Sequence, residues 1–153
     1  MARCALALVM SVLFLPSTLA LAQVAPTARA LASTFNDPAL QWGPCPAFMP
    51  EGCAIAVLHG DPSKDNADVF LKVPAGAHIT RHWHTSAERM VLVSGELRVT
   101  YDGQAEVVLK AGTYAYGPAH LPHAADCVSE APCVLAIAFE APVDAFAGDY
   151  QPR

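Results

Sequence analysis

The sequence has little charge and no run of basic residues. Nine of its 153 residues are Lys or Arg and 14 are Asp or Glu, so the formal net charge is −5. Proteins that bind nucleic acid or anionic membranes gather basic residues into runs or onto one face. The composition therefore argues against both kinds of partner. At this length we expect one domain with an adequate core.

The sequence also lacks an uninterrupted apolar run that is long enough to span a bilayer. The best candidate, residues 5–15, is stopped by Pro16 and falls short of the roughly 20 residues that a transmembrane helix needs. Arg3 before this run and an A-L-A triplet at residues 20–22 are typical of a secretory signal peptide. We predict an export signal over residues 1–22 and a periplasmic or secreted protein without stable membrane insertion after cleavage.

Cysteine is scarce, but outside the predicted signal its number is even. Cys45, Cys53, Cys127 and Cys133 are expected to be oxidised in an exported protein. Four cysteines allow three pairings, of which the local one, Cys45 with Cys53 and Cys127 with Cys133, is the simplest. A second possibility concerns Cys127. It lies four residues after His123, so on one strand both side chains face the same side, and Cys127 can face the interior near a bound metal.

No helical repeat is visible beyond residue 53, and short strand signals recur instead. Runs rich in β-branched and aromatic residues alternate with turn residues. The expected strands cover residues 54–59, 68–73, 89–93, 97–101, 105–109, 113–116, 124–128 and 133–139. An Asp-Gly pair at residues 102–103 indicates a hairpin. The pattern predicts an all-β barrel or sandwich.

Two histidines and a glutamate stand close together in residues 76–95. His82 and His84 are two residues apart, so on a strand both imidazoles point to the same side. Glu88 follows four residues later, and His123 can join them from a neighbouring strand. Imidazoles and a carboxylate that converge on one point suit a divalent transition metal. The alternative is a pair of exposed strand histidines with an unrelated glutamate.

Glycines flank this stretch at spacings that resemble a known family. The first motif of the cupin superfamily is reproduced without a gap by Gly76, His82, His84, Glu88 and Gly95. The second motif is matched in part by Gly112, Pro118 and His123. Two positions depart from it, because His120 replaces a glycine and Cys127 replaces an asparagine. Neither position is a metal ligand in the family, and the resemblance covers about residues 55–140.

The resemblance implies an all-β fold of the cupin type, a double-stranded β-helix or jelly-roll barrel. It implies that one divalent transition metal ion is held near one mouth of the barrel by His82, His84, Glu88 and His123. The ion can be Fe, Mn, Ni, Cu or Zn, because affinity alone does not separate them. Each ligating imidazole is then expected to donate its other ring N–H to a carbonyl or carboxylate. Small cupins often pair through barrel edges, so a homodimer is compatible with the resemblance.

Two segments flank the cupin domain that we expect at residues 53–142. Residues 23–52 are rich in Pro and Ala and are interpreted as an N-terminal arm. This arm either covers one barrel mouth as a lid or packs outside the barrel. Residues 143–153 are interpreted as a C-terminal tail. All of the candidate metal ligands therefore fall inside the central segment.

Tyrosines near the second motif are candidates for contact with a bound substrate. Tyr114 and Tyr116 stand two residues apart, so both are expected to face one side of a strand. We interpret Tyr116 as a candidate catalytic residue beside Glu88; the alternative is a tyrosine that lines the core. His78 has the parity of His82, which places it behind the ligands unless a bulge intervenes.

The resemblance determines the fold and the metal more firmly than the reaction, because one fold hosts many chemistries. The first hypothesis is an exported metal-dependent enzyme, a dioxygenase-like oxidoreductase that acts on a small organic molecule such as an enol, a diketone or a phenol. In this hypothesis Glu88 can also transfer a proton. The alternatives are a cupin that binds or senses a ligand or oxidant without turnover, and a metal-dependent isomerase, lyase or decarboxylase.

Overall fold

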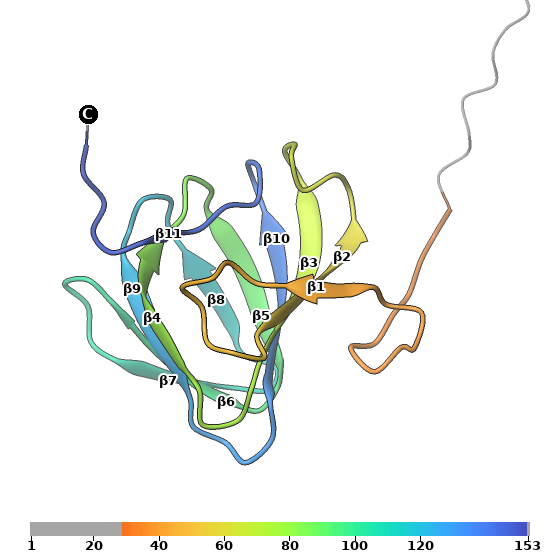
Figure 1. Ribbon diagram of the computed structural model, residues 1–153, viewed down its shortest axis with the longest axis horizontal. Coiled ribbons are helices and arrows are strands. Elements are labelled where there is room, and N and C mark those ends of the chain that lie inside the picture. Colours follow the sequence, from red (N-terminus) through yellow and green to blue (C-terminus); the bar gives the residue numbers. More distant parts are fainter. Residues whose placement is uncertain (1–28, 153) are drawn as a thin grey trace, which may run out of the picture. The chain divides into compact units, whose positions relative to one another are not determined.

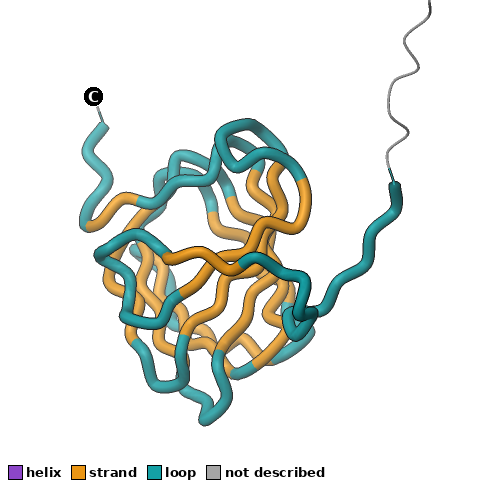
Figure 2. Tube along the Cα trace, turned by 45° about the vertical axis from the view of Figure 1, so that its right-hand side comes forward, coloured by secondary structure: helices purple, strands orange, loops and turns teal. Residues whose placement is uncertain are grey.

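The computed structural model describes residues 29–152. The predicted export signal at residues 1–22 lies outside this range. Contacts divide the chain into residues 1–31 and residues 32–153, and the fold described below belongs to the second unit. Within residues 29–152, no helix is long and apolar enough to cross a membrane. Figure 2 shows that the described part consists of strands and loops.

The strands form two antiparallel sheets (Figure 1). The order in the first sheet is β1 (Trp42–Pro44), β2 (Ala54–His59), β3 (Ala67–Val73), β10 (Cys133–Phe139), β5 (Glu88–Ser94) and β8 (Tyr114–Gly117). The order in the second is β11 (Phe146–Ala147), β4 (His78–Trp83), β9 (His123–Cys127), β6 (Glu96–Tyr101) and β7 (Val107–Lys110). This confirms the all-β jelly-roll fold that the sequence predicts.

The predicted strands match the observed ones to within one or two residues. β2 and β10 have the predicted bounds. β7 begins at Val107, so the Asp-Gly pair belongs to a longer connection, residues 102–106, in which Gly103 has a φ of 70°. β1 and β11 were not predicted, because each has only two or three residues, and β11 pairs with a strand distant in sequence. They lie in the segments interpreted as arm and tail.

The core lies between the two sheets, where alternate residues of each strand point inward. Leu92 on β5, Val69 on β3, Leu97 on β6 and Ile137 on β10 all belong to one buried apolar cluster. This alternation is the period-2 pattern of a strand with one face buried. The core continues up to the metal-ligand candidates, which are the polar side chains at one end of an otherwise apolar interior.

The four cysteines form two disulfides with the predicted local pairing. Cys45 is bonded to Cys53, and Cys127 to Cys133. The second pair lies in the buried core. The alternative in which Cys127 is a free thiol beside the metal is therefore wrong, because its sulfur is bonded to that of Cys133. Two disulfides are compatible with export, since oxidising compartments favour them.

Protein that lacks residues 1–22 and is purified from an oxidising compartment is expected to show no titratable thiol. Both pairs are already bonded, and burial protects the one between Cys127 and Cys133 from reductant. Thiol titration under denaturing conditions, combined with intact mass, measures this. The same protein after full reduction is the control and should show four thiols. Two titratable thiols before reduction, with Cys127 among them, would contradict the assignment.

Candidate metal centre

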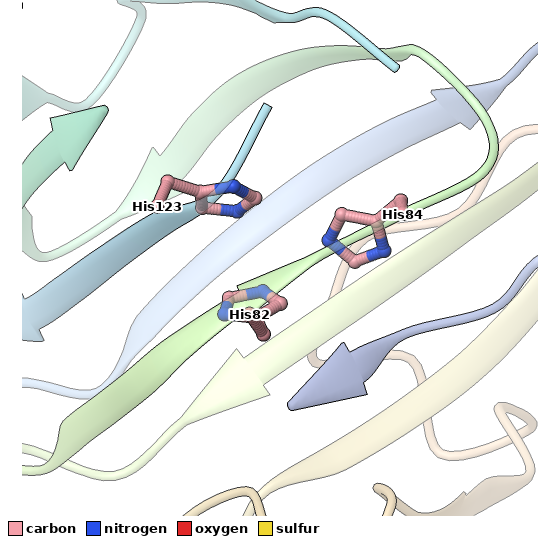
Figure 3. Close-up of side chains that lie close together, drawn as sticks. All are labelled: His82, His84 and His123. Carbon is pink, nitrogen blue, oxygen red and sulfur yellow. The ribbon is translucent and has the colours of Figure 1, made fainter. Parts of the chain in front are cut away.

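Three strands bring the candidate ligands to one end of the barrel. His82 lies near the end of β4, directly opposite His123 at the start of β9. His84 follows two residues after His82, and Glu88 is the first residue of β5. Figure 3 shows the three imidazole rings turned toward one another. Residues far apart in sequence therefore meet because the pairing of β4 with β9 places them side by side.

The spacing of the three imidazoles suits a single ion. One ring nitrogen from each of His82, His84 and His123 lies within 4.8 Å of the others, and all three side chains are buried. Three imidazoles that converge in this way could hold a divalent metal ion. Glu88 lies against two of them: its Oε2 is 3.5 Å from Nε2 of His84 and 3.9 Å from Nε2 of His123.

A bulge in β4 determines which side chains face the ligand cluster. The pairing of β4 with β9 shifts register between Ile79 and His82, so both of these residues point inward. His78 points outward instead, and its Nδ1 lies 2.7 Å from Oδ1 of Asp126. The expectation that His78 stands behind the ligands is therefore wrong, because the bulge interrupts the two-residue alternation.

Each of the three imidazoles has a main-chain carbonyl at its Nδ1. The carbonyl of Thr80 is 2.8 Å from Nδ1 of His82, and the carbonyl of Leu121 is 3.2 Å from Nδ1 of His123. The carbonyl of Asp144 accepts from Nδ1 of His84. A hydrogen bond of this kind places the proton on Nδ1 and leaves the lone pair of Nε2 free to bind a metal.

The donor set fits a cation. Nε2 of His84 is buried and has no hydrogen-bond partner, which is rare for a polar atom in a folded protein. Its nearest charged neighbour is the carboxylate of Glu88. A metal ion among Nε2 of His84, the other two imidazoles and this carboxylate would give the unpaired lone pair a partner. The residues present therefore fit the metal that the cupin resemblance implies.

Burial controls the protonation of the cluster. Burial, together with the smaller effect of neighbouring imidazoles, lowers the pKa of His82 to about 3 and that of His123 to about 4. Both rings are therefore neutral near pH 7 and able to act as ligands. Burial also raises the pKa of Glu88, an effect that His84 opposes. A bound cation would favour the ionised form of this carboxyl.

Tyr116 is not brought to the ligand cluster. It lies on the outer face of β8 with half of its surface exposed. The residue of β8 that faces the cluster is Gly117, which pairs with Glu88. A Cβ added at Gly117 would lie 3.2 Å from Oε2 of Glu88. Successive residues of a strand face opposite sides, so Gly117 faces inward and Tyr116, one residue earlier, faces outward.

Tyr101 is the tyrosine that the structure brings to the site. It is the last residue of β6, pairs with His123, and its ring centroid is 4.8 Å from that of His123. Burial raises its pKa, so the phenol is protonated near neutral pH. The sequence held a signal for it, because Leu97, Val99 and Tyr101 alternate with polar residues up to the Asp-Gly hairpin. The parity of this strand predicts an inward Tyr101.

The comparison with protein families agrees with the geometry. The family model described as "Cupin domain" matches residues 69–139, which include all four ligand candidates. The chain is a member of the cupin superfamily. No sequence among the curated proteins compared matches this cupin.

Solved structures support the fold of the cupin. The DMSP lyase DddQ from Ruegeria pomeroyi is 20% identical, with a TM-score of 0.61, over 71% of this chain and 60% of the lyase. A variant of the oxalate decarboxylase OxdC from Bacillus subtilis is 26% identical, with a TM-score of 0.55, over 64% of this chain and 28% of the decarboxylase. An uncharacterised double-stranded β-helix protein from Klebsiella pneumoniae is 18% identical, with a TM-score of 0.54, over 67% of this chain and 92% of that protein. The chain thus spans less than two thirds of the length of the two enzymes.

The ligand candidates of this cupin open into a cavity of about 260 Å³ with a largely apolar wall. Pro46 and Met49 of the N-terminal arm form part of that wall, and the carbonyl of Phe48 accepts a hydrogen bond from Thr80 Oγ1 on β4. These residues of the arm therefore contact the barrel beside the cavity. Residues 143–145 line the cavity as well. Within the described part of the chain, no lysine or arginine is among the lining residues.

Proposed function

We propose that this cupin is a metal-dependent enzyme, a dioxygenase-like oxidoreductase that acts on a small organic molecule. The observation that supports this proposal most strongly is the buried cluster of three imidazoles at the end of an apolar cavity. In this proposal His82, His84, His123 and Glu88 hold one divalent ion. The similar structures named above are a lyase and a decarboxylase, which supports small-molecule chemistry without specifying the reaction.

The bound ion would supply Lewis acidity and, if it is redox-active, electrons for dioxygen chemistry. The chain supplies the surroundings. Glu88 is buried beside two of the imidazoles, and the bound cation would keep its carboxyl ionised, so a carboxylate oxygen could accept a proton from a substrate that binds beside it. The phenol of Tyr101 faces the same space. The apolar wall excludes water and strengthens every electrostatic interaction inside it.

The cavity favours a substrate with a single oxygen-bearing end. A cavity of about 260 Å³ lies near the lower limit of ligand pockets, which begin at about 300 Å³. A dicarboxylate could place one carboxylate on the ion, but among the described lining residues no cationic side chain would balance the second. An enol, a diketone or a phenol places oxygen toward the ligands and carbon against the apolar wall.

Export is the other part of the proposal. Residues 1–22 would act as the signal, and the two disulfides would then form in the periplasm or outside the cell. In that location the protein would meet small molecules from its environment. The Cys45–Cys53 disulfide would stay oxidised there and hold the arm beside the cavity.

The test is an activity screen on apo-protein loaded separately with Fe(II), Mn(II), Ni(II), Cu(II) or Zn(II). Oxygen uptake and product formation are followed with a panel of small enols, diketones and phenols, and with oxalate as the dicarboxylate control. We expect turnover with oxygen uptake for one class of the panel, with one redox-active metal, and none with oxalate. Turnover without oxygen uptake would instead identify lyase, isomerase or decarboxylase chemistry. Saturable binding without turnover under any metal would contradict the enzyme and favour a sensor.

A further inference from the structure

The last part of the described chain packs along β4. Residues 143–150, called the C-terminal strap below, follow β10 and lie outside the part of the chain that matches the cupin domain. Figure 1 shows β11, which belongs to the strap, beside β4. Phe146 of β11 pairs with Trp83 and Ala147 pairs with His82. The strap thus adds an edge strand directly beside a metal-ligand candidate.

Polar contacts fasten the strap on both sides of this short strand. The N–H of Gly148 donates to the carbonyl of Arg81 over 2.9 Å, and Nε of Arg81 donates to Oδ1 of Asp149 over 2.6 Å. At the other end, the Asp144 carboxylate accepts from the backbone N–H of Thr85 over 2.9 Å and from the Thr85 hydroxyl. Asp144 is therefore held in place by its own side chain.

Aromatic rings fasten the strap from outside the barrel. Phe146 stacks on Trp83 with centroids 4.6 Å apart, and Tyr150 meets the edge of the same indole at 4.9 Å. Tyr150 also stacks on His120, with centroids 4.5 Å apart. Stacked and edge-to-face pairs stabilise a contact beyond the burial of their surface. These rings connect the strap to β4 and to the loop before β9.

His84 is the ligand candidate whose orientation depends on the strap. Its Nδ1–H donates to the main-chain carbonyl of Asp144, 60 residues away in sequence. The corresponding carbonyls for His82 and His123 lie two residues away, within or next to their own strands. Two imidazoles are thus oriented locally. The third is oriented by a segment that must first dock.

The departure at His120 from the cupin motif is consistent with this role. His120 has a φ of 63°, a conformation that glycine adopts without cost. Its N–H donates to the carbonyl of His84 over 2.8 Å, so the turn is itself in contact with the ligand segment. A glycine would keep this turn and would remove the ring on which Tyr150 stacks. The histidine therefore provides a docking surface for the strap, although glycine would adopt this backbone conformation at a lower energetic cost.

We propose that the C-terminal strap is a positioning element of the metal centre. Docking of its aromatic residues on Trp83 and His120 holds the Asp144 carbonyl against Nδ1 of His84, which aims Nε2 at the ion. The inference rests on the metal centre of the proposed function. It adds that a segment outside the matched cupin domain determines how tightly that centre binds metal.

The test compares metal affinity among variants of the full chain. Tyr150→Ala is expected to weaken Co(II) binding by less than the roughly 10- to 100-fold that follows when the group behind a metal ligand is removed, because Asp144 keeps its contacts with Thr85. It is also expected to change the visible spectrum of bound Co(II). Tyr150→Phe keeps the ring and should restore both properties. Tyr114→Ala is the matched control, because it removes an exposed tyrosine from β8. Thermal unfolding of each apo-protein shows that the fold is intact.

A second variant protects the test against misfolding. His120→Gly relieves the positive φ, which offsets part of the stability lost with the ring contacts, so the apo-protein should stay folded. It should still weaken Co(II) binding, because the stack with Tyr150 is lost. Tyr150→Ala and His120→Gly proteins that bind Co(II) as tightly as wild type, with an unchanged spectrum, would overturn the role of the strap. Wild-type protein that binds no metal would overturn the metal centre and the strap together.

Discussion

Replacing His82 with Ala is expected to remove bound metal from the protein while the barrel stays folded. His82 provides one of three converging imidazoles, and the carbonyl of Thr80 lies 2.8 Å from its Nδ1. We expect the affinity for a divalent ion to fall by more than about 100-fold, because loss of a group behind a ligand already costs about 10- to 100-fold. The apolar core does not include this side chain, so the fold should survive.

Metal content per chain after dialysis against a weak chelator, together with thermal unfolding, measures the effect. His78→Ala is the matched control, since it removes a histidine from the same strand whose side chain points outward to Asp126. The control should keep one equivalent of metal. His82→Ala protein that keeps one equivalent as tightly as wild type would contradict the ligand assignment.

Replacing Ser86 with Ala is expected to destabilise the protein by about 1–3 kcal/mol, the cost of leaving one buried polar group without a partner. The Ser86 side chain is almost fully buried between His84 and Glu88. Its Oγ accepts the backbone N–H groups of Glu140 and Ala141, each over 2.9 Å. Alanine removes the partner of the Ala141 N–H, whereas the Glu140 N–H keeps a 3.3 Å hydrogen bond to the carbonyl of Ala87. The loss also loosens the turn that separates two ligand candidates.

Thermal unfolding of the apo-protein measures this change, and we expect a decrease in Tm of about 5–15 °C. Ser94→Ala is the matched control, because its hydroxyl makes one 3.2 Å contact, to the carbonyl of Pro132, and should cost at most about 1 kcal/mol. An equal loss in the two variants would show that Ser86 does not connect the ligand turn to the end of β10.

Three of the ligand candidates, His82, His84 and Glu88, could be predicted from the sequence because they are local. His82 and His84 share a face through strand alternation, and the flanking glycines fix the spacing of the cupin motif around Glu88. The disulfides were also predictable, since each closes a short loop. In these cases the information lies within about ten residues of the feature, where backbone geometry alone is sufficient.

The residues that complete the site depend on contacts that the sequence does not show. The bulge in β4 turns His78 outward, and the register of β8 against β5 turns Tyr116 outward and Gly117 inward. Tyr101 reaches the site through pairing of β6 with β9. The carbonyl of Asp144 has no signal in sequence at all, because any residue has one and only the docked strap brings it to His84.

X-ray absorption of the protein loaded with one equivalent of Zn(II) tests the metal centre most directly. The account predicts nitrogen and oxygen neighbours at about 2.0–2.1 Å, with the outer-ring scattering of three imidazoles in wild type and of two in His123→Ala. Wild-type spectra without imidazole scattering, or identical spectra for wild type and His123→Ala, would contradict a metal held by His82, His84 and His123.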